Sequence, residues 1–167
     1  MKKIKKLVAI QPVSFLEENK PLLNDYCDEV VFYDTQPESA EEIVSRIGDA
    51  DAIFVSYTHA IRGDILSECP NLKYIGMCCS LYSEASSNVD IAYAREHGIV
   101  VTGIRDYGDE GVAEYVLMNS IRRLHGADGY QPLLGDISEV SGAKVGLLGL
   151  GASAQVVARA LKMMGAD

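Results

Sequence analysis

The stretch that decides the fold is Lys144-Val-Gly-Leu-Leu-Gly-Leu-Gly151, which is followed by an apolar-periodic segment, residues 152–165. An apolar run leads into two glycines one residue apart, Gly149 and Gly151, and Ala154 stands three residues after the second. This order predicts a buried strand, a tight glycine turn and a helix. The first glycine allows a sharp turn, the second leaves room for a pyrophosphate, and the small third residue lets helix and strand pack closely.

The turn supplies the predicted cofactor contacts. They are Gly149, Leu150, Gly151, Ala152, Ser153 and Ala154. The N-terminus of the following helix offers free backbone N–H groups and the positive end of its dipole to a phosphate. The alternative is an ordinary glycine-rich turn that binds no ligand. The acidic residue that would hold a cofactor ribose is expected about 20 residues after the glycines, beyond Asp167. We therefore expect only the opening of a nucleotide-binding domain.

The composition is that of a soluble globular chain, with 48% hydrophobic and 23% charged residues among 167. The net charge of −9 argues against nonspecific nucleic-acid binding, which needs a basic surface. No stretch approaches the roughly 18 apolar residues of a membrane span. The apolar run after the basic N-terminus is too short for a secretion signal. We therefore expect a cytoplasmic protein with no nucleic-acid partner and no membrane partner.

The four cysteines are Cys27, Cys69, Cys78 and Cys79. None of them forms a C-x-x-C pair, and the adjacent two are poorly placed for a disulfide or a zinc site. This pattern predicts reduced thiols and no metal site. Two interpretations of the adjacent pair stay open. They are reactive thiols if a cation or a helix N-terminus lowers a pKa, or small buried hydrophobic side chains.

Short apolar segments alternate with helical segments over the first two thirds of the chain. The predicted strands are residues 7–10, 29–33, 52–55, 73–77 and 99–102. Strands that are apolar on both faces and alternate with helices indicate an α/β fold with a parallel sheet and helices on both sides. We predict a first domain at residues 1–104, a linking segment with one long helix at residues 105–126, and an incomplete nucleotide-binding domain at residues 127–167.

Four motifs, in a fixed order, carry a resemblance to a known family. They are Leu72-Lys-Tyr-Ile-Gly76, Asn88-Val-Asp90 with Gly98-Ile-Val-Val101 after it, Glu110-Gly-Val-Ala-Glu114, and Val145-Gly-Leu-Leu-Gly-Leu-Gly151. On these motifs the chain resembles the N-terminal half of the D-isomer-specific 2-hydroxyacid dehydrogenases. The match in order and spacing covers residues 50–167, whereas residues 1–50 match only in pattern.

The resemblance implies two α/β domains with the active site in the cleft between them. The first would be a flavodoxin-like five-stranded domain that presents the substrate loop, and the second a Rossmann domain that holds NAD or NADP. Hydride would pass between the nicotinamide and C2 of a small 2-hydroxy or 2-keto acid. The family's His acid/base, its orienting Glu and its carboxylate-binding Arg would lie beyond Asp167, so no residue here is a predicted catalytic residue. We expect weak or absent cofactor binding and no activity from this chain alone.

The predicted substrate-binding residues are Cys79, Ser80 and Leu81. The resemblance places them in a loop whose backbone N–H groups would meet the substrate carboxylate. This chain departs from the family pattern there, because Cys79 and Leu81 stand where relatives commonly have glycines. Asp109 is a second departure, at a position where many relatives carry a hydroxyl residue near the nicotinamide.

Two further functions compete with an enzyme fragment: a self-associating binding module, and a truncated gene product without activity. Residues 144–165 would expose an apolar strand edge if neighbouring strands were missing, and the helix at residues 109–125 would lack the domain on which it packs. We therefore expect a homo-oligomer that forms through these two segments. Glu114 in this helix either is stabilised by the helix dipole or contacts the cleft. The three histidines have no matching family position and are not predicted catalytic residues: His59, His97 and His125.

Overall fold

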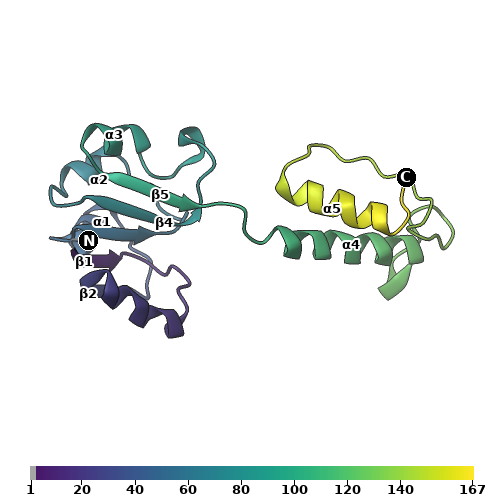
Figure 1. The fold of residues 1–167 in the computed structure, drawn as a ribbon, viewed down its shortest axis with the longest axis horizontal. Coiled ribbons are helices and arrows are strands. Elements are labelled where there is room, and N and C mark those ends of the chain that lie inside the picture. The colour runs from purple at the N-terminus through teal and green to yellow at the C-terminus, as the bar shows by residue number, and fades with distance from the viewer. Residues whose placement is uncertain (1–2) are drawn as a thin grey trace. The chain divides into compact units, whose positions relative to one another are not determined.

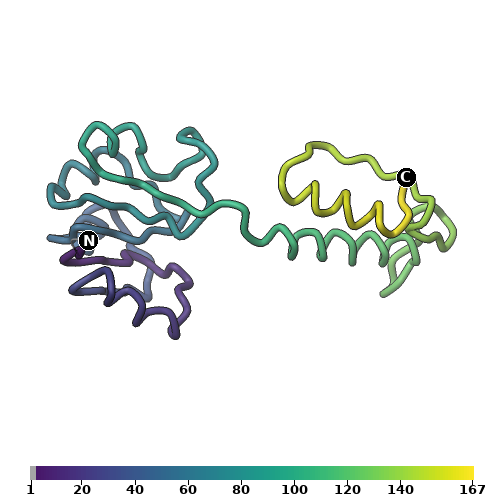
Figure 2. The backbone as a smooth tube through the Cα atoms, viewed as in Figure 1, coloured from purple at the N-terminus to yellow at the C-terminus, as the bar shows by residue number. Residues whose placement is uncertain are grey.

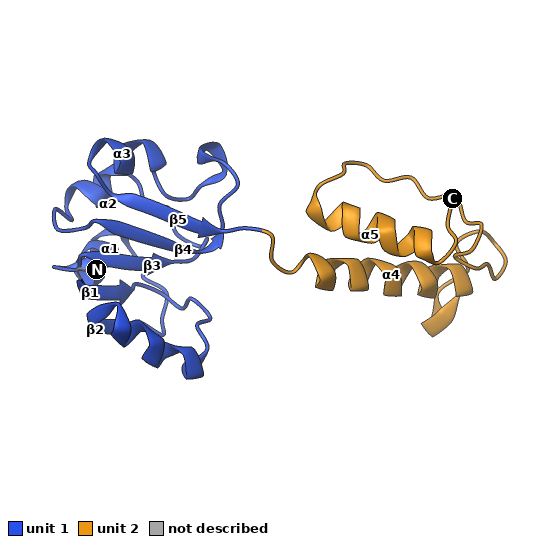
Figure 3. Cartoon of the chain, viewed as in Figure 1, with its two compact units in different colours: residues 1–105 blue, residues 106–167 orange. Residues whose placement is uncertain are grey.

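The computed structural model describes residues 3–167, and the chain forms two compact units that divide between Arg105 and Asp106 (Figure 3). The first unit is a sheet flanked by helices, and the second is a pair of helices with their connecting segments (Figure 1). Among residues 3–167, no helix has the length and apolar content that crossing a bilayer requires. The assignment of substrate and cofactor roles to the two units stays a prediction.

The first unit is built on a five-stranded sheet. The strands are β1 (Ile4–Ala9), β2 (Cys27–Phe32), β3 (Ala52–Val55), β4 (Tyr74–Ser80) and β5 (Val100–Ile104). They lie in the order β2-β1-β3-β4-β5, and every neighbouring pair is parallel. This is the strand order of flavodoxin-like folds, in which the direction of winding changes between β1 and β3. The predicted α/β class and its flavodoxin-like parallel sheet are confirmed.

One face of the sheet carries the main apolar core. Val8, Ile53 and Ile75 lie next to one another in register on three adjacent strands, and all three are buried. The helices that pack on this core are α1 (Ala40–Ile47), α2 (Gly63–Ser67) and α3 (Ile91–Glu96). Burying apolar side chains between helices and sheet removes their surface from water, which stabilises this layer.

The opposite face of the sheet has a smaller core. The 3-10 helix η1 (Glu17–Asp25) contributes Leu23, which packs with Leu7 and Ala52. Successive side chains of a strand point to opposite faces, which explains why Leu7 and Val8 enter different cores. The sheet is therefore covered by α-helices on one face and by a 3-10 helix on the other.

Side-chain caps start two of these helices. The Ser39 hydroxyl accepts a hydrogen bond from the Glu42 backbone N–H at 3.2 Å and so caps α1. The Asp90 carboxylate accepts one from the Tyr93 N–H at 3.0 Å and caps α3. Each cap gives a partner to an N–H group that has none within its helix. A single 3-10 turn, η2 (Glu84–Ser86), lies between β4 and α3.

The second unit is a pair of helices joined by a long connecting segment. Its elements are α4 (Asp109–His125), the 3-10 turn η3 (Ala127–Gly129) and α5 (Ala152–Met163). Ala113 and Leu124 of α4 share one apolar cluster with Val157 and Leu161 of α5. The two helices therefore lie side by side (Figure 1). The chain leaves α4 through Gly126 at φ +65°, a conformation that favours glycine. The predicted long helix is confirmed.

The segment before the glycine turn differs from the prediction. The sequence predicts a buried strand at residues 145–150, but these residues belong to no strand and are exposed. The Val145 N–H donates to the Asp167 carbonyl at 2.9 Å, and the Asp167 N–H donates to the Ala143 carbonyl at 2.8 Å. These bonds have the pattern of a parallel ladder. A buried strand needs partners along its whole length, and within residues 3–167 the ladder ends here, so the prediction is wrong for this segment.

The connecting segment, residues 130–151, runs back along α5 and ends in the glycine turn (Figure 2). The Gly142 N–H donates to the Gly165 carbonyl at 2.7 Å, which fixes this segment beside the C-terminal end of α5. At its other end the chain enters α5 through Gly151. The segment, the turn and the helix thus follow the path of a β–α unit, with the first limb unpaired over residues 146–150.

Candidate functional site

The glycine turn leads directly into α5. Gly149 takes φ +92°, and Gly151 is the N-cap of α5 with φ −73° and ψ −175°. The Gln155 side chain folds over the turn, and its Nε2 donates to the Leu150 carbonyl at 3.2 Å. The predicted sharp bend and the predicted helix after it are both confirmed. The six predicted cofactor contacts therefore lie together, at the turn and in the first helical residues.

The backbone explains the glycine at position 149 but not the glycine at position 151. The positive φ of Gly149 favours glycine, because other residues rarely adopt it. The backbone angles of Gly151 suit any residue, and a Cβ atom there would meet no other atom within 4 Å. The fold therefore does not require glycine at position 151. A remaining physical reason for glycine at position 151 is the close approach of a ligand to the backbone.

The start of α5 has the features of an anion site. The first-turn N–H groups of Ala152, Ser153 and Ala154 have no acceptor within the helix, and the helix dipole adds partial positive charge there. Backbone N–H groups in this arrangement bind phosphate groups. One acidic side chain lies at the same place, because the Ser153 hydroxyl donates a hydrogen bond to the Asp109 carboxylate of α4.

The three predicted substrate-binding residues lie at the carboxyl end of β4. Cys79 and Ser80 belong to the strand, and the Cys79 side chain is buried in the main core. Leu81 follows the strand, and its backbone N–H donates to the Ile104 carbonyl at 3.2 Å. This N–H group is occupied, which argues against its use for a substrate carboxylate. The substrate-binding role of these residues stays a prediction.

Sequence reasoning misses Arg105, which holds this edge of the sheet. Its Nε donates to the Leu81 carbonyl at 2.7 Å, and its Nη2 donates to the Tyr82 carbonyl at 3.1 Å. The signal in the sequence is its place three residues after the strand predicted at residues 99–102, since the carboxyl ends of parallel strands meet at one edge. Arg105 thus brings a positive charge next to the predicted substrate-binding residues.

The Asn88-Val89-Asp90 motif connects two loops at the same edge. The Asn88 amide donates to the Ser56 carbonyl at 2.8 Å and to the His59 carbonyl at 2.6 Å. Val89 is buried and pairs with Ile61 in a parallel bridge. Together with the cap formed by Asp90, these contacts give every residue of the motif a structural role. The motif supports the loops without supplying a reactive group.

The adjacent thiols lie within β4 and are poor nucleophiles at neutral pH. Burial raises the pKa of Cys78 to about 11 and also raises the pKa of Cys79. A thiol with a raised pKa stays protonated at pH 7, whereas the thiolate is the reactive form. Cys79 is buried in the main core and Cys78 is half-buried, which favours the interpretation as small hydrophobic side chains. Among the residues that the structure describes, no group of three or more His, Cys, Asp or Glu is placed to hold a metal ion.

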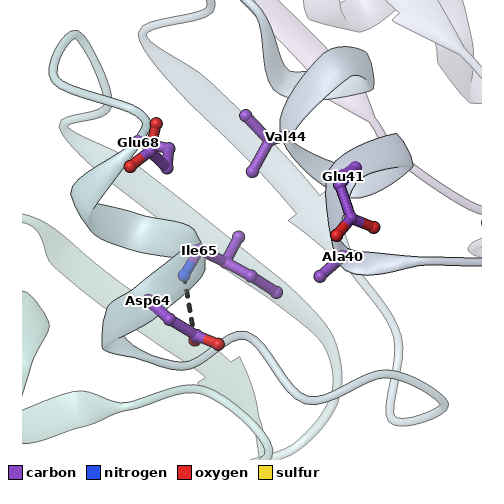
Figure 4. Close-up of a pocket in the computed structure, with 6 residues that line it drawn as sticks. All are labelled: Ala40, Glu41, Val44, Asp64, Ile65 and Glu68. Atoms are coloured by element: carbon purple, nitrogen blue, oxygen red, sulfur yellow. Dashed lines mark hydrogen bonds between the residues drawn. The ribbon is translucent and has the colours of Figure 1, made fainter.

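A pocket of about 340 Å³ lies between α1 and α2 in the first unit (Figure 4). Its lining residues are Ala40, Glu41, Val44, Asp64, Ile65 and Glu68. None of the predicted site residues is among them. Carboxylates around an apolar floor provide neither a nucleophile with its base nor a set of backbone donors. The glycine turn is therefore the better candidate for a functional site.

Comparison with known proteins agrees with the fold. The family model for the D-isomer specific 2-hydroxyacid dehydrogenase catalytic domain matches residues 8–165. The chain belongs to this family. A hydroxypyruvate reductase of Blautia hydrogenotrophica is 26% identical over 153 residues, which are 82% of this chain and 46% of the relative. A glyoxylate reductase of Thermofilum pendens is 31% identical over 149 residues, which are 81% of this chain and 43% of the relative.

A solved structure of similar fold is the NAD⁺-bound 3-phosphoglycerate dehydrogenase of Entamoeba histolytica. It matches with a TM-score of 0.68 and 22% identity, over 99% of this chain and 53% of that chain. The family to which this chain belongs thus includes relatives named as reductases of hydroxypyruvate and glyoxylate. The chain spans about half the length of the relatives that it matches.

Proposed function

We propose that this chain forms the substrate-side domain and the opening nucleotide-binding unit of an NAD(P)-dependent oxidoreductase that acts on a small 2-hydroxy or 2-keto acid. The cofactor supplies a nicotinamide that exchanges hydride with C2 of the acid. The contribution of this chain is binding: the first turn of α5 holds the pyrophosphate, and the carboxyl end of β4 faces the substrate. We expect the 167-residue chain alone to be inactive, because the family resemblance implies that the acid/base His lies beyond the residues of this chain.

The observation that supports this proposal most is that the fold itself does not require glycine at position 151. Its backbone angles suit any residue and its surroundings leave room for a Cβ atom, yet the position carries glycine at the start of a helix. A ligand that needs contact with the backbone explains both facts. The neighbouring N–H groups of the first turn of α5 supply donors for a pyrophosphate.

The test is the replacement of Gly151 by aspartate. We expect the dissociation constant for NAD⁺ to rise at least tenfold, because the new carboxylate occupies and repels the phosphate position. The free energy of unfolding should stay the same or rise by a few tenths of a kcal/mol, because aspartate is a favourable N-cap residue. Titration of millimolar NAD⁺ into ¹⁵N-labelled protein, followed through the amide shifts of residues 149–154, measures the affinity.

Gly146→Asp is the matched control. Gly146 lies before the turn, and a Cβ atom there meets no other atom within 4 Å. This variant adds the same charge away from the start of α5, so its affinity should stay within about twofold of wild type. Equal NAD⁺ affinity in wild type and Gly151→Asp would contradict a pyrophosphate site at the turn.

A second candidate function is self-association, and the exposed leucines before the turn favour it. Leu147, Leu148 and Leu150 are 42%, 107% and 66% exposed. The N–H and C=O groups of such an unpaired apolar segment can pair with another chain. We propose that two copies associate through residues 144–165 and the exposed side of α4. This proposal takes a second copy of the chain as the partner.

Leu148→Lys should shift the chain toward monomer, with at least a tenfold rise in the dimer dissociation constant. The added charge would have to be desolvated in an apolar contact, which is unfavourable. Light scattering over micromolar concentrations measures the molar mass. Leu134→Lys is the control, because Leu134 is 67% exposed but lies outside residues 144–165. A wild-type chain that stays monomeric over this range would rule out the self-associating module.

A further inference from the structure

The N-termini of α4 and α5 meet at the glycine turn. Asp109 is the first residue of α4, and Ser153 is the second residue of α5. The Ser153 hydroxyl donates to the Asp109 carboxylate across 44 residues of sequence. The helices share an apolar cluster along their length, so they run in parallel from this shared end (Figure 1).

Two parallel helices with adjacent N-termini place two partial positive charges side by side. Each helix contributes the equivalent of about half an elementary charge at its N-terminus. The Asp109 carboxylate lies between them and makes no ion pair with any lysine or arginine of residues 3–167. Its partner is instead the Ser153 hydroxyl, in the same first turn of α5 whose backbone N–H groups a pyrophosphate would use.

We infer that Asp109 sets the affinity of the glycine turn for dinucleotides, because it acts as an internal anion that competes with the pyrophosphate for the start of α5. This inference rests on the proposed function. Asp109 weakens the binding of a dinucleotide through two effects. The Ser153 hydroxyl donates to Asp109 and is not free to donate to a phosphate, and the carboxylate repels the negative charge of the ligand.

Asp109→Asn removes the charge and keeps the shape of the side chain. Two unit charges about 6 Å apart at an effective dielectric constant of about 40 change an equilibrium by about tenfold. We therefore expect the dissociation constant of the full chain for NAD⁺ to fall about tenfold at low ionic strength. The gain should shrink as salt is added, because salt screens charges near the surface. Inorganic pyrophosphate as a second probe should show the same gain if the phosphates are the group that is recognised.

Glu110→Gln is the matched control. It removes the same charge from the next residue of the first turn of α4, and none of the hydrogen bonds between α4 and α5 in residues 3–167 involves the Glu110 side chain. We expect less than a twofold change in NAD⁺ affinity for this variant. Ser153→Ala breaks the contact but keeps the Asp109 charge, so its gain should stay below threefold. Asp109→Ser is a second uncharged variant in case Asp109→Asn folds poorly.

The outcomes separate the inference from the proposed function. Unchanged affinity in both Asp109 variants, with weaker binding in Gly151→Asp, would overturn the role of Asp109 and leave the nucleotide site intact. An equal gain in Glu110→Gln would also overturn it, because net charge alone would then explain the effect. No amide shift with millimolar NAD⁺ in any variant would overturn both. A merely structural role of Asp109 predicts lower stability without tighter, salt-sensitive binding.

Discussion

Replacement of Arg46 by methionine is expected to lower the free energy of unfolding of the first unit by about 3 kcal/mol. Arg46 is 8% exposed in α1. Its Nη1 donates to the Ile10 carbonyl at 2.8 Å and to the Thr35 carbonyl at 2.5 Å, and its Nη2 donates to the Glu42 carboxylate at 2.6 Å. The guanidinium also lies 4.5 Å from the centre of the Tyr33 ring. Methionine fills a similar volume but leaves these acceptors without a donor.

The size of this effect follows from where the acceptors lie. Ile10 directly follows β1, and the hydrogen bond from Arg46 to its carbonyl is buried. A hydrogen bond to a charged group contributes about 1.5–3 kcal/mol, and an unpartnered buried acceptor also costs its desolvation. The Arg46–Glu42 pair adds less, because the Glu42 side chain is 38% exposed and solvent screens it. Arg46 therefore acts mainly by joining α1 to the segments that follow β1 and β2 through hydrogen bonds.

Urea unfolding followed by circular dichroism, together with hydrogen exchange of the β1 amides, measures the change in the first unit. Arg95→Met is the control, because Arg95 pairs with Glu84 on the surface and both side chains are more than half exposed. This variant should change the unfolding free energy by no more than about 0.5 kcal/mol. If Arg46→Met changes the free energy of unfolding as little as this control does, the Arg46 contacts do not stabilise the unit.

Much of the first unit follows from local patterns in the sequence. The apolar segment at residues 52–55 is predicted as a strand with the same bounds as β3, because β-branched and aromatic residues there suit a pleated, buried surface. Alternation of such segments with helices is enough to predict a parallel sheet. The glycine turn is predictable for the same reason, because Gly149 carries a backbone requirement that is local.

The errors concern features that depend on distant partners. Residues 145–150 are as apolar as a buried strand, but within residues 3–167 their pairing stops at the contact with Asp167. The strand predicted at residues 73–77 continues to Ser80, because Ser80 pairs with Ile104 of β5. A short apolar run cannot show which strand will lie beside it. The bounds of β4 and the exposure of the segment before the turn therefore could not be read from the sequence.

The contacts that shape the candidate site are also non-local. Ser153 and Asp109 are 44 residues apart, and Arg105 and Leu81 are 24 residues apart. Sequence reasoning identifies Ser153 and Leu81 as site residues and notes Asp109 as unusual, but it does not join them. Side-chain hydrogen bonds of this kind depend on the packing of whole elements, such as α4 on α5.

Replacement of Gly103 by valine is expected to lower the free energy of unfolding of the first unit by about 3 kcal/mol. It should also displace the predicted substrate edge, which is the carboxyl end of β4 with Cys79, Ser80 and Leu81. A Cβ atom on Gly103 would lie 2.3 Å from the Leu81 Cβ and 3.4 Å from the Cys79 carbonyl oxygen. A Cβ atom is fixed to the backbone, so no change of rotamer relieves the first contact. The backbone at Leu81 must move, and the Leu81 N–H hydrogen bond to Ile104 must lengthen.

Hydrogen exchange separates this effect from a general loss of stability. The amide of Leu81 should exchange faster in Gly103→Val than the loss of global stability alone explains. Gly111→Ala is the control for adding a methyl group to glycine, because a Cβ atom on Gly111 in α4 meets no other atom within 4 Å. It should be neutral or stabilising by up to about 1 kcal/mol. Wild-type unfolding and unchanged Leu81 exchange in Gly103→Val would mean that β5 does not hold Leu81 in place, and the predicted substrate edge would then lack its support from Gly103.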